Sequence, residues 1–175
     1  MSAATAGPRT DVAAARVRLL VLDVDGVLTD GRLYYGTRGE ALKVFHVRDG
    51  LGMKLLAAAG VTIAVISGRR SDMTGRRCRE LGIRHSFQGV EDKLAVFHRL
   101  RERLGLASGV CACVGDDVAD IPLMREVGLA FAVADAHPQA RRAAQMVTNL
   151  PGGRGAVREI CDYLLEARGR AAAAK

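Results

Sequence analysis

The sequence predicts an α/β fold: a doubly wound, Rossmann-like parallel sheet with helices on both faces. Three continuous apolar runs carry this prediction, and each ends in a polar residue: 17–23, 61–67 and 110–116. Such unbroken runs are typical of strands that are buried on both faces. Amphipathic stretches separate them, and this alternation of strand and helix favours right-handed crossovers within one parallel sheet.

The remaining elements follow in chain order. Residues 31–47 combine a Tyr pair, a Gly-rich middle and rough alternation, which predicts a β-hairpin insertion. A helix over 48–59 is closed by Gly60 and another over 91–104 by Gly105, because glycine readily ends helices. The other predicted elements are helices over 71–81, 117–127 and 155–168 and strands near 84–87, 129–133 and 146–148.

The composition fits one domain with a core of aliphatic side chains. The chain has 175 residues, of which 49% are hydrophobic but only 4% aromatic, so Ala, Val, Leu and Ile must fill the core. This composition excludes a disordered chain. We expect a single domain over 17–167, with flexible tails over the Ala-rich ends, 1–16 and 168–175.

Cysteine usage and hydropathy indicate a cytoplasmic protein. Four cysteines are too few for a secreted disulfide scaffold of this length, and none has the spacing of a zinc site. Cys111 and Cys113 alternate within an apolar run, as small residues on one face of a buried strand do. No run is long enough to cross a bilayer, and the first residues lack a hydrophobic signal core. We therefore expect reduced thiols and no membrane partner.

The net charge of +7 does not indicate a nucleic-acid partner. Residues 1–20 and 166–175 each contribute +2, so the 145 residues between them carry only +3. A nucleic-acid binder usually gathers basic residues beside stacking aromatic side chains, and no stretch here does so. We expect a small-molecule ligand and no nucleic acid.

Polar residues end the three strongest predicted strands. Asp23 ends the first, Ser67 the second and Asp116 the third. In a parallel α/β sheet, ligands bind beyond the carboxyl ends of the strands. We therefore expect these three side chains at one edge of the sheet, where they would form a site.

The segment LDVDGVLTDG is the most informative part of the sequence. Asp23 follows a strand too apolar to hold an uncompensated charge, and Asp25 can project to the same side while Gly26 turns the chain. Two carboxylates this close repel each other unless a divalent cation neutralises them or one holds a proton. Either outcome suits a site where one Asp attacks and the other exchanges protons. Taken alone, the pattern also fits an Asp that caps a turn.

A second acidic group follows the third strand. Asp116 ends the strand itself, and hard carboxylate oxygens that converge there suit magnesium. Asp117 and Asp120 stand at the start of the next helix, where such residues cap and stabilise it. Their role stays open between helix stabilisation and the site.

Two further signals suit a phosphate group. Ser67, Gly68 and Arg69 form a strand-to-helix turn whose hydroxyl and free N–H groups offer a phosphate cradle, although Ser-Gly is also an ordinary turn. Lys93 is one of only four lysines and stands at a helix start, where the helix dipole disfavours a cation. It is either a solvated surface residue or a phosphate partner.

These motifs, in this order, resemble those of the haloacid dehalogenase superfamily. The resemblance rests on Asp23–Asp25, Ser67, Lys93 and Asp116–Asp117. It implies a magnesium-dependent phosphatase that works through an aspartyl-phosphate, with Asp23 as nucleophile and Asp25 as general acid and base. Ser67 and Lys93 would hold the phosphoryl oxygens, while Asp23, the main-chain carbonyl of Asp25 and Asp116 would bind Mg²⁺. Positioning and charge neutralisation are what phosphoryl transfer mostly requires.

Within that superfamily, the chain is similar to the 3-deoxy-D-manno-octulosonate 8-phosphate phosphatase family from about Val17 to about Leu165. The segments that carry the similarity are DVDGVLTDG, HVRDGLGMKLL, SGR, FQGVEDK, VGDDVADIPLM, VADAHP and GGRGAVREICD. The intervals between the motifs leave no room for a cap domain, so a capless protein is expected. The resemblance implies release of phosphate from an eight-carbon sugar acid in lipopolysaccharide biosynthesis, and a homotetramer.

The same resemblance implies the substrate contacts. A sugar acid phosphate carries a carboxylate as well as a phosphate, so several arginines make sense. His46 and Lys54 depart from the Asn and Arg that the family often has. Arg69 and Arg77 are eight positions apart and are expected to share a face. The implied contacts are Asp25, His46, Val47, Arg48, Asp49, Gly50, Lys54, Ser67, Gly68, Arg69, Arg77 and Lys93.

Two alternative functions share this scaffold. The phosphatases of nine-carbon sialic-type acid 9-phosphates tend to place Glu where this chain has Arg69. A non-catalytic oligomerising or regulatory module would be expected to lack Asp23, Asp25 or Lys93, and all three are present. Arg154, in a Gly-Gly-Arg-Gly loop, either reaches an anion or ends a turn.

The predicted hairpin is also the expected contact between subunits. Its apolar side chains are unsuited to a solvated arm, and an isolated hairpin is marginally stable in water. Pairing between copies would bury them and cover an open site. We expect active sites at subunit interfaces of a homotetramer, with a neighbour's tail after Leu165 as a candidate cover. The apolar hairpin residues are Leu33, Tyr34, Tyr35, Val44 and Phe45.

Overall fold

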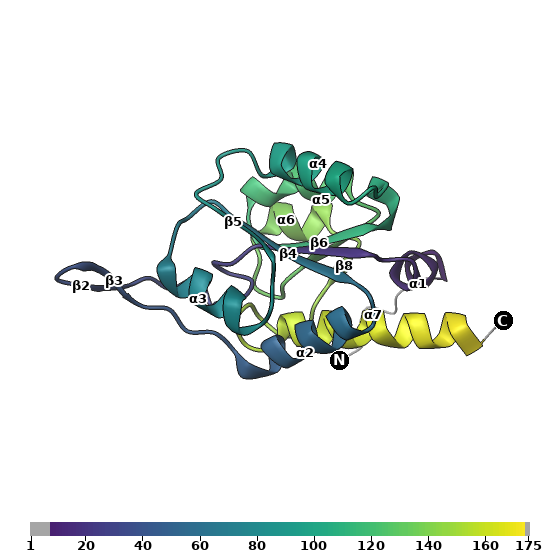
Figure 1. The fold of residues 1–175 in the computed structure, drawn as a ribbon, viewed down its shortest axis with the longest axis horizontal. Helices are drawn as coiled ribbons and strands as arrows, with labels where there is room; N and C mark the ends of the chain where they lie inside the picture. The colour runs from purple at the N-terminus through teal and green to yellow at the C-terminus, as the bar shows by residue number, and fades with distance from the viewer. Residues whose placement is uncertain (1–7, 174–175) are drawn as a thin grey trace.

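A six-stranded parallel sheet forms the centre of the molecule in this computed structural model, which describes residues 8–173 (Figure 1). The strand order is β5-β4-β1-β6-β7-β8, and every neighbouring pair is parallel. The predicted α/β fold is thereby confirmed. The three apolar runs form the adjacent strands β4 (Thr62–Ser67), β1 (Leu19–Leu22) and β6 (Cys111–Gly115).

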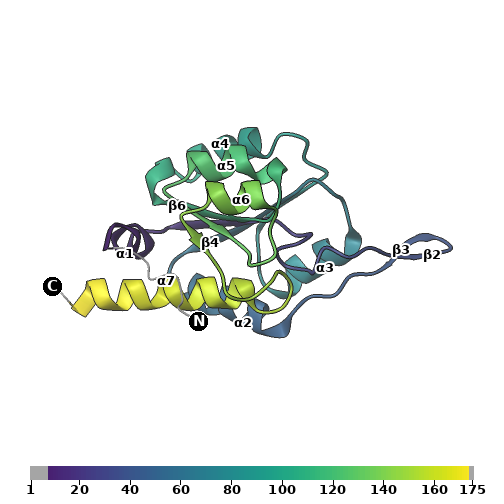
Figure 2. The same ribbon diagram turned by 180° about the vertical axis from the view of Figure 1, so that it is seen from behind.

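Helices cover both faces of the sheet (Figures 1 and 2). On one face lie α4 (Lys93–Arg103), α5 (Ile121–Glu126) and α6 (Pro138–Ala143). On the other lie α2 (Val47–Ala58), α3 (Asp72–Glu80) and α7 (Ala156–Ala173). The remaining elements of the domain are β5 (His85–Gln88), β7 (Leu129–Ala132), β8 (Met146–Val147) and the 3₁₀ turns η1 (Ser108–Val110) and η2 (Val118–Asp120).

The central strands are buried throughout, as their unbroken hydrophobicity requires. All residues of β1 and β6 are buried between the two helical layers. Aliphatic side chains and alanines make up most of the core, with Phe97 and Phe131 as its largest members. All four cysteines are buried and free, and Cys111 and Cys113 lie in β6 as expected.

The hairpin is confirmed but is shorter than the predicted segment. Strands β2 (Tyr34–Gly36) and β3 (Gly39–Leu42) pair antiparallel in a sheet of their own, which projects from the body of the molecule (Figure 1). Two helical regions differ from the prediction. The segment 117–127 is divided into η2 and α5, and α6 was not predicted. The signal for α6 was His137 before a proline, since the His137 side chain caps the helix by accepting the N–H of Gln139.

The chain ends contain more helix than the expected tails. Helix α1 (Pro8–Ala15) lies within 1–16 and is tied to α7, because the Tyr163 hydroxyl donates to Asp11 over 2.9 Å. Helix α7 runs to Ala173, and Arg168 donates to the carbonyl oxygens of Val17 and Ala59 at 3.0 and 2.9 Å. These long-range contacts have no signature in the Ala-rich ends. The parts of the expected tails at 1–7 and 174–175 lie outside the described residues.

No helix within residues 8–173 has the length and hydropathy needed to span a bilayer.

Candidate active site

The three central strands bring the predicted polar residues to one edge. Strand β1 lies between β4 and β6 and pairs with both in parallel register. The residue that follows β1, Asp23, is therefore flanked by Ser67 at the end of β4 and by Asp116 after β6. This arrangement is the one predicted from the strand ends.

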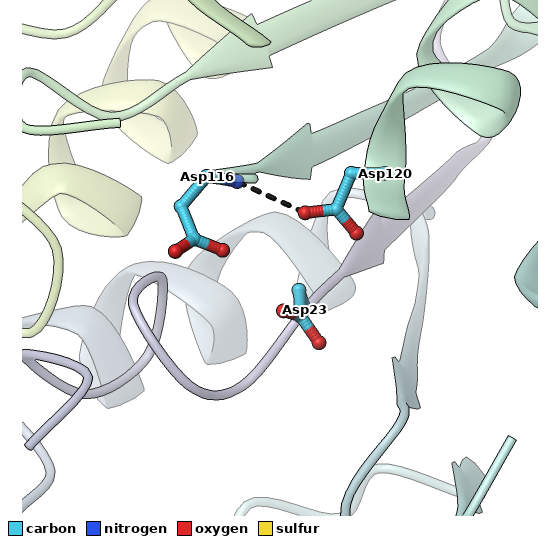
Figure 3. Close-up of side chains that lie close together, drawn as sticks. All are labelled: Asp23, Asp116 and Asp120. Carbon is cyan, nitrogen blue, oxygen red and sulfur yellow. Dashed lines mark hydrogen bonds between the residues drawn. The ribbon is translucent and has the colours of Figure 1, made fainter. Parts of the chain in front are cut away.

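Four charged side chains form a compact group at this edge, which we call the rim cluster: Asp23, Lys93, Asp116 and Asp120. Lys93 Nζ lies 2.9 Å from Asp23 Oδ1 and 2.7 Å from Asp120 Oδ1. The three aspartates each offer a carboxylate oxygen within 4.8 Å of the others (Figure 3). Three carboxylates and one ammonium leave a formal charge of −2, which is the charge that one divalent cation would balance.

Burial and the repulsion of neighbouring carboxylates raise the pKa values of Asp23 and Asp116 in the rim cluster. Burial and then the Asp120 carboxylate raise the pKa of Asp23 to about 6. Burial and then the carboxylates of Asp23 and Asp120 raise the pKa of Asp116 to about 8. Burial lowers the pKa of Lys93, but the same two carboxylates outweigh it and raise that pKa. A cation that balanced the charge would relieve this repulsion, and an all-oxygen donor set fits Mg²⁺.

Asp120 belongs to the rim cluster, which answers a question the sequence left open. It is buried, and its Oδ2 accepts the N–H groups of Asp116 and Asp117 at 3.0 and 3.3 Å, while its Oδ1 faces Lys93. Asp117 is exposed and caps η2 by accepting the N–H of Val118. The turn of η2 brings the fourth residue after Asp116 back to the strand end, so only Asp120 reaches the site.

Lys93 is a buried site residue rather than a solvated one. It is 8% exposed, although it begins α4, where the helix dipole disfavours a cation. The cap of that helix is Asp92, which accepts the N–H of Ala95. The contacts of Lys93 with Asp23 and Asp120 compensate for its burial.

A second charged group surrounds Asp25, and we call it the hairpin cluster: Asp25, Glu40, Lys43 and Arg69. Lys43 Nζ donates to Asp25 Oδ1 and lies 3.5 Å from Glu40 Oε1. Arg69 Nη2 donates to the same Glu40 oxygen over 3.2 Å, and its Nε lies 3.7 Å from Asp25 Oδ2. Two carboxylates and two cations make this cluster formally neutral.

Sequence reasoning missed Glu40 and Lys43. Both lie in the hairpin segment, where charged residues are expected to face water. The available signal was that Lys43 is one of four lysines and stands between the apolar Leu42 and Val44. That the base of the hairpin folds back onto Asp25 depends on contacts between segments that are far apart in sequence.

Glycines allow the loops around Asp23 to pack closely. Gly26 has a φ of 91°, and a Cβ there would lie 2.0 Å from Asp116 Oδ2. A Cβ on Gly152 would lie 1.7 Å from the carbonyl oxygen of Gly26, and the Gly153 N–H donates to the Val27 carbonyl over 2.9 Å. The Gly-Gly-Arg-Gly loop therefore supports the loop that carries Asp25.

The expected substrate contacts on α2 are not joined to the rim cluster by any ion pair or hydrogen bond among residues 8–173. The His46 side chain caps α2 by accepting the N–H of Arg48 over 3.3 Å. Asp49 is 1% exposed, and its Oδ1 accepts the N–H of Arg158 at the start of α7. Their side chains thus contact the protein itself, while the side chains of Val47, Arg48 and Lys54 are exposed.

Arg69 and Arg77 do not share a helical face, contrary to the expectation from their spacing. Arg69 precedes α3, which begins at Asp72, and contacts the hairpin cluster. Arg77 lies within α3 against α2, where a Cβ on Gly50 would lie 2.4 Å from its Nη2. The turn between β4 and α3 breaks the helical spacing, so the two arginines have different surroundings.

Arg154 lines a hollow of about 400 Å³ together with the neighbouring Gly153. The other residues around this hollow are Asp30, Val44, His46 and Arg48. The two arginines outnumber the one carboxylate of this lining, Asp30, which is compatible with the anion-binding interpretation of Arg154.

Known proteins share this fold and these motifs. The sequence pattern of the haloacid dehalogenase-like hydrolases matches residues 46–128. The 3-deoxy-D-manno-octulosonate 8-phosphate phosphatase of Salmonella typhimurium is 49% identical over 96% of this chain and 89% of its own. The crystal structure of the Yersinia pestis phosphatase of that name has a TM-score of 0.91 and 46% identity, covering 93% of this chain and 88% of its own.

A third similar structure was solved with ligands. The 3-deoxy-D-manno-octulosonate 8-phosphate phosphatase from Moraxella catarrhalis, in complex with a magnesium ion, a phosphate ion and a KDO molecule, has a TM-score of 0.89 and 40% identity over 94% of each chain. The fold and the rim cluster define a hydrolase of the haloacid dehalogenase type. Given the extent of these matches, the chain belongs to the 3-deoxy-D-manno-octulosonate 8-phosphate phosphatase family.

Proposed function

We propose that this chain hydrolyses 3-deoxy-D-manno-octulosonate 8-phosphate to the free sugar acid and phosphate, with Mg²⁺ as cofactor, in lipopolysaccharide biosynthesis. One observation carries the chemistry: a buried Asp23 paired with Lys93 stands in the middle of a rim cluster whose charge of −2 suits a divalent cation. The 49% identity with an eight-carbon sugar acid phosphatase over 96% of the chain selects the substrate.

Asp23 attacks phosphorus and carries the phosphoryl group as an aspartyl-phosphate. Its pKa, although raised to about 6, leaves it ionised at neutral pH, as a nucleophile must be. Lys93 holds the Asp23 carboxylate at 2.9 Å and, with a second N–H on Asp120, has one further N–H group for a phosphoryl oxygen. Mg²⁺, held by Asp23, the main-chain carbonyl of Asp25 and Asp116, supplies positive charge that stabilises the transferring phosphoryl group.

The residues around the nucleophile complete the reaction. Asp25 acts as general acid toward the leaving sugar and as general base toward water. Ser67 and Gly68, at the turn after β4, hold phosphoryl oxygens. Arg69 and Arg77 bind the sugar acid, since guanidinium groups suit its carboxylate and phosphate.

The predicted substrate contacts on α2 lie outside the rim cluster. We place Val47, Arg48 and Lys54 at the substrate of an assembled protein, because their side chains are exposed, with His46, Asp49 and Gly50 as the helix start that positions them. All residues with a proposed role lie within 17–167, which we take as the catalytic domain.

The alternative functions are not favoured. The relatives reported above act on the eight-carbon acid phosphate, and Arg69 stands where a nine-carbon acid phosphatase would tend to have Glu. A non-catalytic module would not preserve a buried Asp23–Lys93 pair together with Asp25. Phosphate release should be measured across eight- and nine-carbon sugar acid phosphates and a generic aryl ester. Preference for the nine-carbon acid, or no release from any ester, would refute the proposal.

An apolar surface supports assembly into a homotetramer. On α2, Val47, Leu51 and Leu55 are exposed at successive turns, and Val47 is 77% exposed. Five further apolar residues of the hairpin segment are exposed, whereas Phe45 packs against the core. They are Leu33, Tyr34, Tyr35, Leu42 and Val44. Burial of such a surface between copies is its simplest use.

A double variant tests the assembly. Tyr35→Glu with Leu51→Glu should lower the mass measured by light scattering or sedimentation from a tetramer to a smaller species. Leu150→Glu is the control, because Leu150 is an exposed leucine outside this surface. A wild type that sediments as an active monomer would contradict the proposal. We also place the protein in the cytoplasm, which agrees with four free and buried cysteines.

A further inference from the structure

Lys43 reaches the site from a part of the molecule that is otherwise exposed. All residues of β2 and three of the four in β3 are exposed. Yet the Lys43 side chain, directly after β3, is only 2% exposed, and its Nζ donates to Asp25 Oδ1. An ammonium leaves water at a high cost unless partners compensate for it. Lys43 has two such partners, Asp25 and Glu40.

The two carboxylate oxygens of Asp25 have different surroundings. Oδ1 accepts the hydrogen bond from Lys43, whereas Oδ2 is buried and has no hydrogen-bond partner among residues 8–173. Arg69 Nε lies 3.7 Å from Oδ2, beyond hydrogen-bond distance. Lys43 therefore occupies Oδ1 with a hydrogen bond, whereas Oδ2 keeps an unused acceptor position.

Glu40 holds the two cations of this arrangement. Its Oε1 lies 3.5 Å from Lys43 Nζ and accepts from Arg69 Nη2 over 3.2 Å. Lys43 and Arg69 thus share one carboxylate on the hairpin and face Asp25 from two sides. Because both Glu40 and Lys43 belong to the hairpin segment, the position of the hairpin determines the position of the Lys43 ammonium.

We propose that Lys43 is a positioning residue for Asp25: it fixes the carboxylate through Oδ1, so that Oδ2 is the oxygen that exchanges a proton with the leaving group and water. The hairpin then has a role in the chemistry as well as in assembly. This inference rests on the proposed function, in which Asp25 is the general acid and base.

The two half-reactions show what Oδ2 must do. In the first, an Asp23 oxygen bonds to phosphorus, the bond from phosphorus to the sugar oxygen breaks, and the proton on Asp25 Oδ2 moves to that oxygen. In the second, a water oxygen bonds to phosphorus, the bond from phosphorus to Asp23 breaks, and a water proton returns to Oδ2. Lys43 keeps its protons throughout.

A comparison of leaving groups separates this role from a purely structural one. The sugar leaves as an alkoxide, which needs a proton, whereas p-nitrophenolate is a stable anion that leaves without one. Loss of a correctly oriented Asp25 should therefore slow the first half-reaction for the sugar ester and spare it for the aryl ester. A general fault in the fold or in phosphate binding would slow both.

The test is Lys43→Met, measured by single-turnover kinetics with enzyme in excess. We expect single-turnover release of the sugar acid to fall about 10²-fold, in the range of a lost general acid. Single-turnover release of p-nitrophenol should stay within about threefold of wild type, and so should the Mg²⁺ concentration for half-maximal activity, because Lys43 does not touch Asp23, Asp116 or Asp120. Arg38→Met is the matched control, since it removes an exposed cation from the same hairpin and should change neither rate.

Two results would overturn the proposal. One is an equal loss for both esters in a Lys43→Met protein that unfolds at the wild-type temperature, and the other is a sugar-ester rate within threefold of wild type. If Lys43→Met does not fold, Lys43→Arg replaces it. Because Lys43→Arg keeps the cation, it should retain more than about a tenth of the wild-type sugar-ester rate. A folded Lys43→Arg protein with a lower sugar-ester rate than this would also refute the role.

Failure of the proposed function would look different. A wild type that releases no sugar acid from 3-deoxy-D-manno-octulosonate 8-phosphate would refute the assigned substrate. The role of Lys43 could then still be measured with a simple alkyl phosphate and the aryl ester as the pair of leaving groups.

Discussion

The rim cluster and the hairpin cluster meet at the segment Asp23–Asp25 but differ in charge balance. The rim cluster holds three carboxylates and one ammonium, whereas the hairpin cluster holds two carboxylates and two cations. The rim cluster is therefore incomplete without a cation, while the hairpin cluster is complete by itself. The rim cluster is thus suited to binding a cation, and the hairpin cluster is suited to holding the Asp25 side chain in place.

Two carboxyl groups of similar intrinsic acidity show this difference. Burial and the neighbouring carboxylates raise the pKa of Asp116 to about 8. Burial also acts to raise the pKa of Glu40, but a hydrogen bond from Ser71 and the cations of Lys43 and Arg69 outweigh it, so that pKa falls below its ordinary value. The sign of the surrounding charge decides whether the pKa of each carboxyl group rises or falls.

Loss of the nucleophile should have the largest effect on the rim cluster. Asp23→Asn should reduce turnover of the sugar acid phosphate by at least about 10⁴-fold, because an amide is a poor nucleophile and a weak Mg²⁺ ligand. Steady-state phosphate release measures this, with Asp162→Asn on the exposed side of α7 as the control. Near-normal turnover by Asp23→Asn would contradict the proposed mechanism through an aspartyl-phosphate.

A methyl group at Gly26 should disturb the junction of the two clusters. In Gly26→Ala the new Cβ would meet the Asp116 carboxylate at 2.0 Å, at a φ of 91° that costs a non-glycine residue about 1–2 kcal/mol. We expect kcat to fall about 10²-fold and the Mg²⁺ requirement to rise. Gly39→Ala is the matched control, because Gly39 has a φ of 106° but open space around it. Equal effects of the two variants would show that backbone strain alone matters.

Removal of Arg69 should reduce activity toward the sugar acid phosphate more than activity toward an aryl phosphate. Since Arg69 also faces Asp25, Arg69→Met is a cleaner change than a charge reversal to Glu. We expect kcat/KM for the eight-carbon acid phosphate to fall about 10–100-fold, in line with the loss of one charge-assisted contact, and kcat/KM for p-nitrophenyl phosphate to change less than about threefold. Equal loss on both esters would assign Arg69 to the phosphate or to the fold.

The uncompensated negative charge of the rim cluster should also affect the free energy of unfolding. The metal-free folded chain keeps a proton on Asp116 up to about pH 8, whereas the unfolded chain releases it near 3.8. The folded state then binds more protons between these values, so the free energy of unfolding falls as pH rises through the window. Mg²⁺ competes with that proton, and its stabilising effect should therefore grow with pH.

Thermal unfolding with Mg²⁺ or EDTA measures this effect. At pH 8, a Mg²⁺ concentration 100-fold above Kd should contribute about 2.7 kcal/mol, which corresponds to a rise of about 5–10 °C in Tm. At pH 5.5 the rise should be much smaller. Asp116→Asn serves as the control, since it removes the titrating group. A Mg²⁺-induced rise in Tm that is the same at both pH values would contradict the assignment of Asp116.

The parallel sheet and the polar residues at its edge could be predicted from the sequence alone. Continuous apolar runs are typical of strands covered on both faces, so 17–23, 61–67 and 110–116 could be assigned as buried strands of one parallel sheet. Because parallel strands end at one edge, Asp23, Ser67 and Asp116 followed from those runs. These inferences depend on local hydrophobicity and on a rule of topology.

Which other charged side chains reach the site depends on how distant segments pack together. Glu40 and Lys43 have the sequence context of a solvated hairpin, and Asp120 has that of a helix cap, yet each lies against a residue of the proposed active site. Asp49 has the context of a binding residue, yet its carboxylate accepts an N–H group from the start of α7. The physical reason is that the environment of a charged side chain, unlike the hydropathy of a strand, is set by partners distant in sequence, whose approach depends on how hairpin, turn and helix pack together.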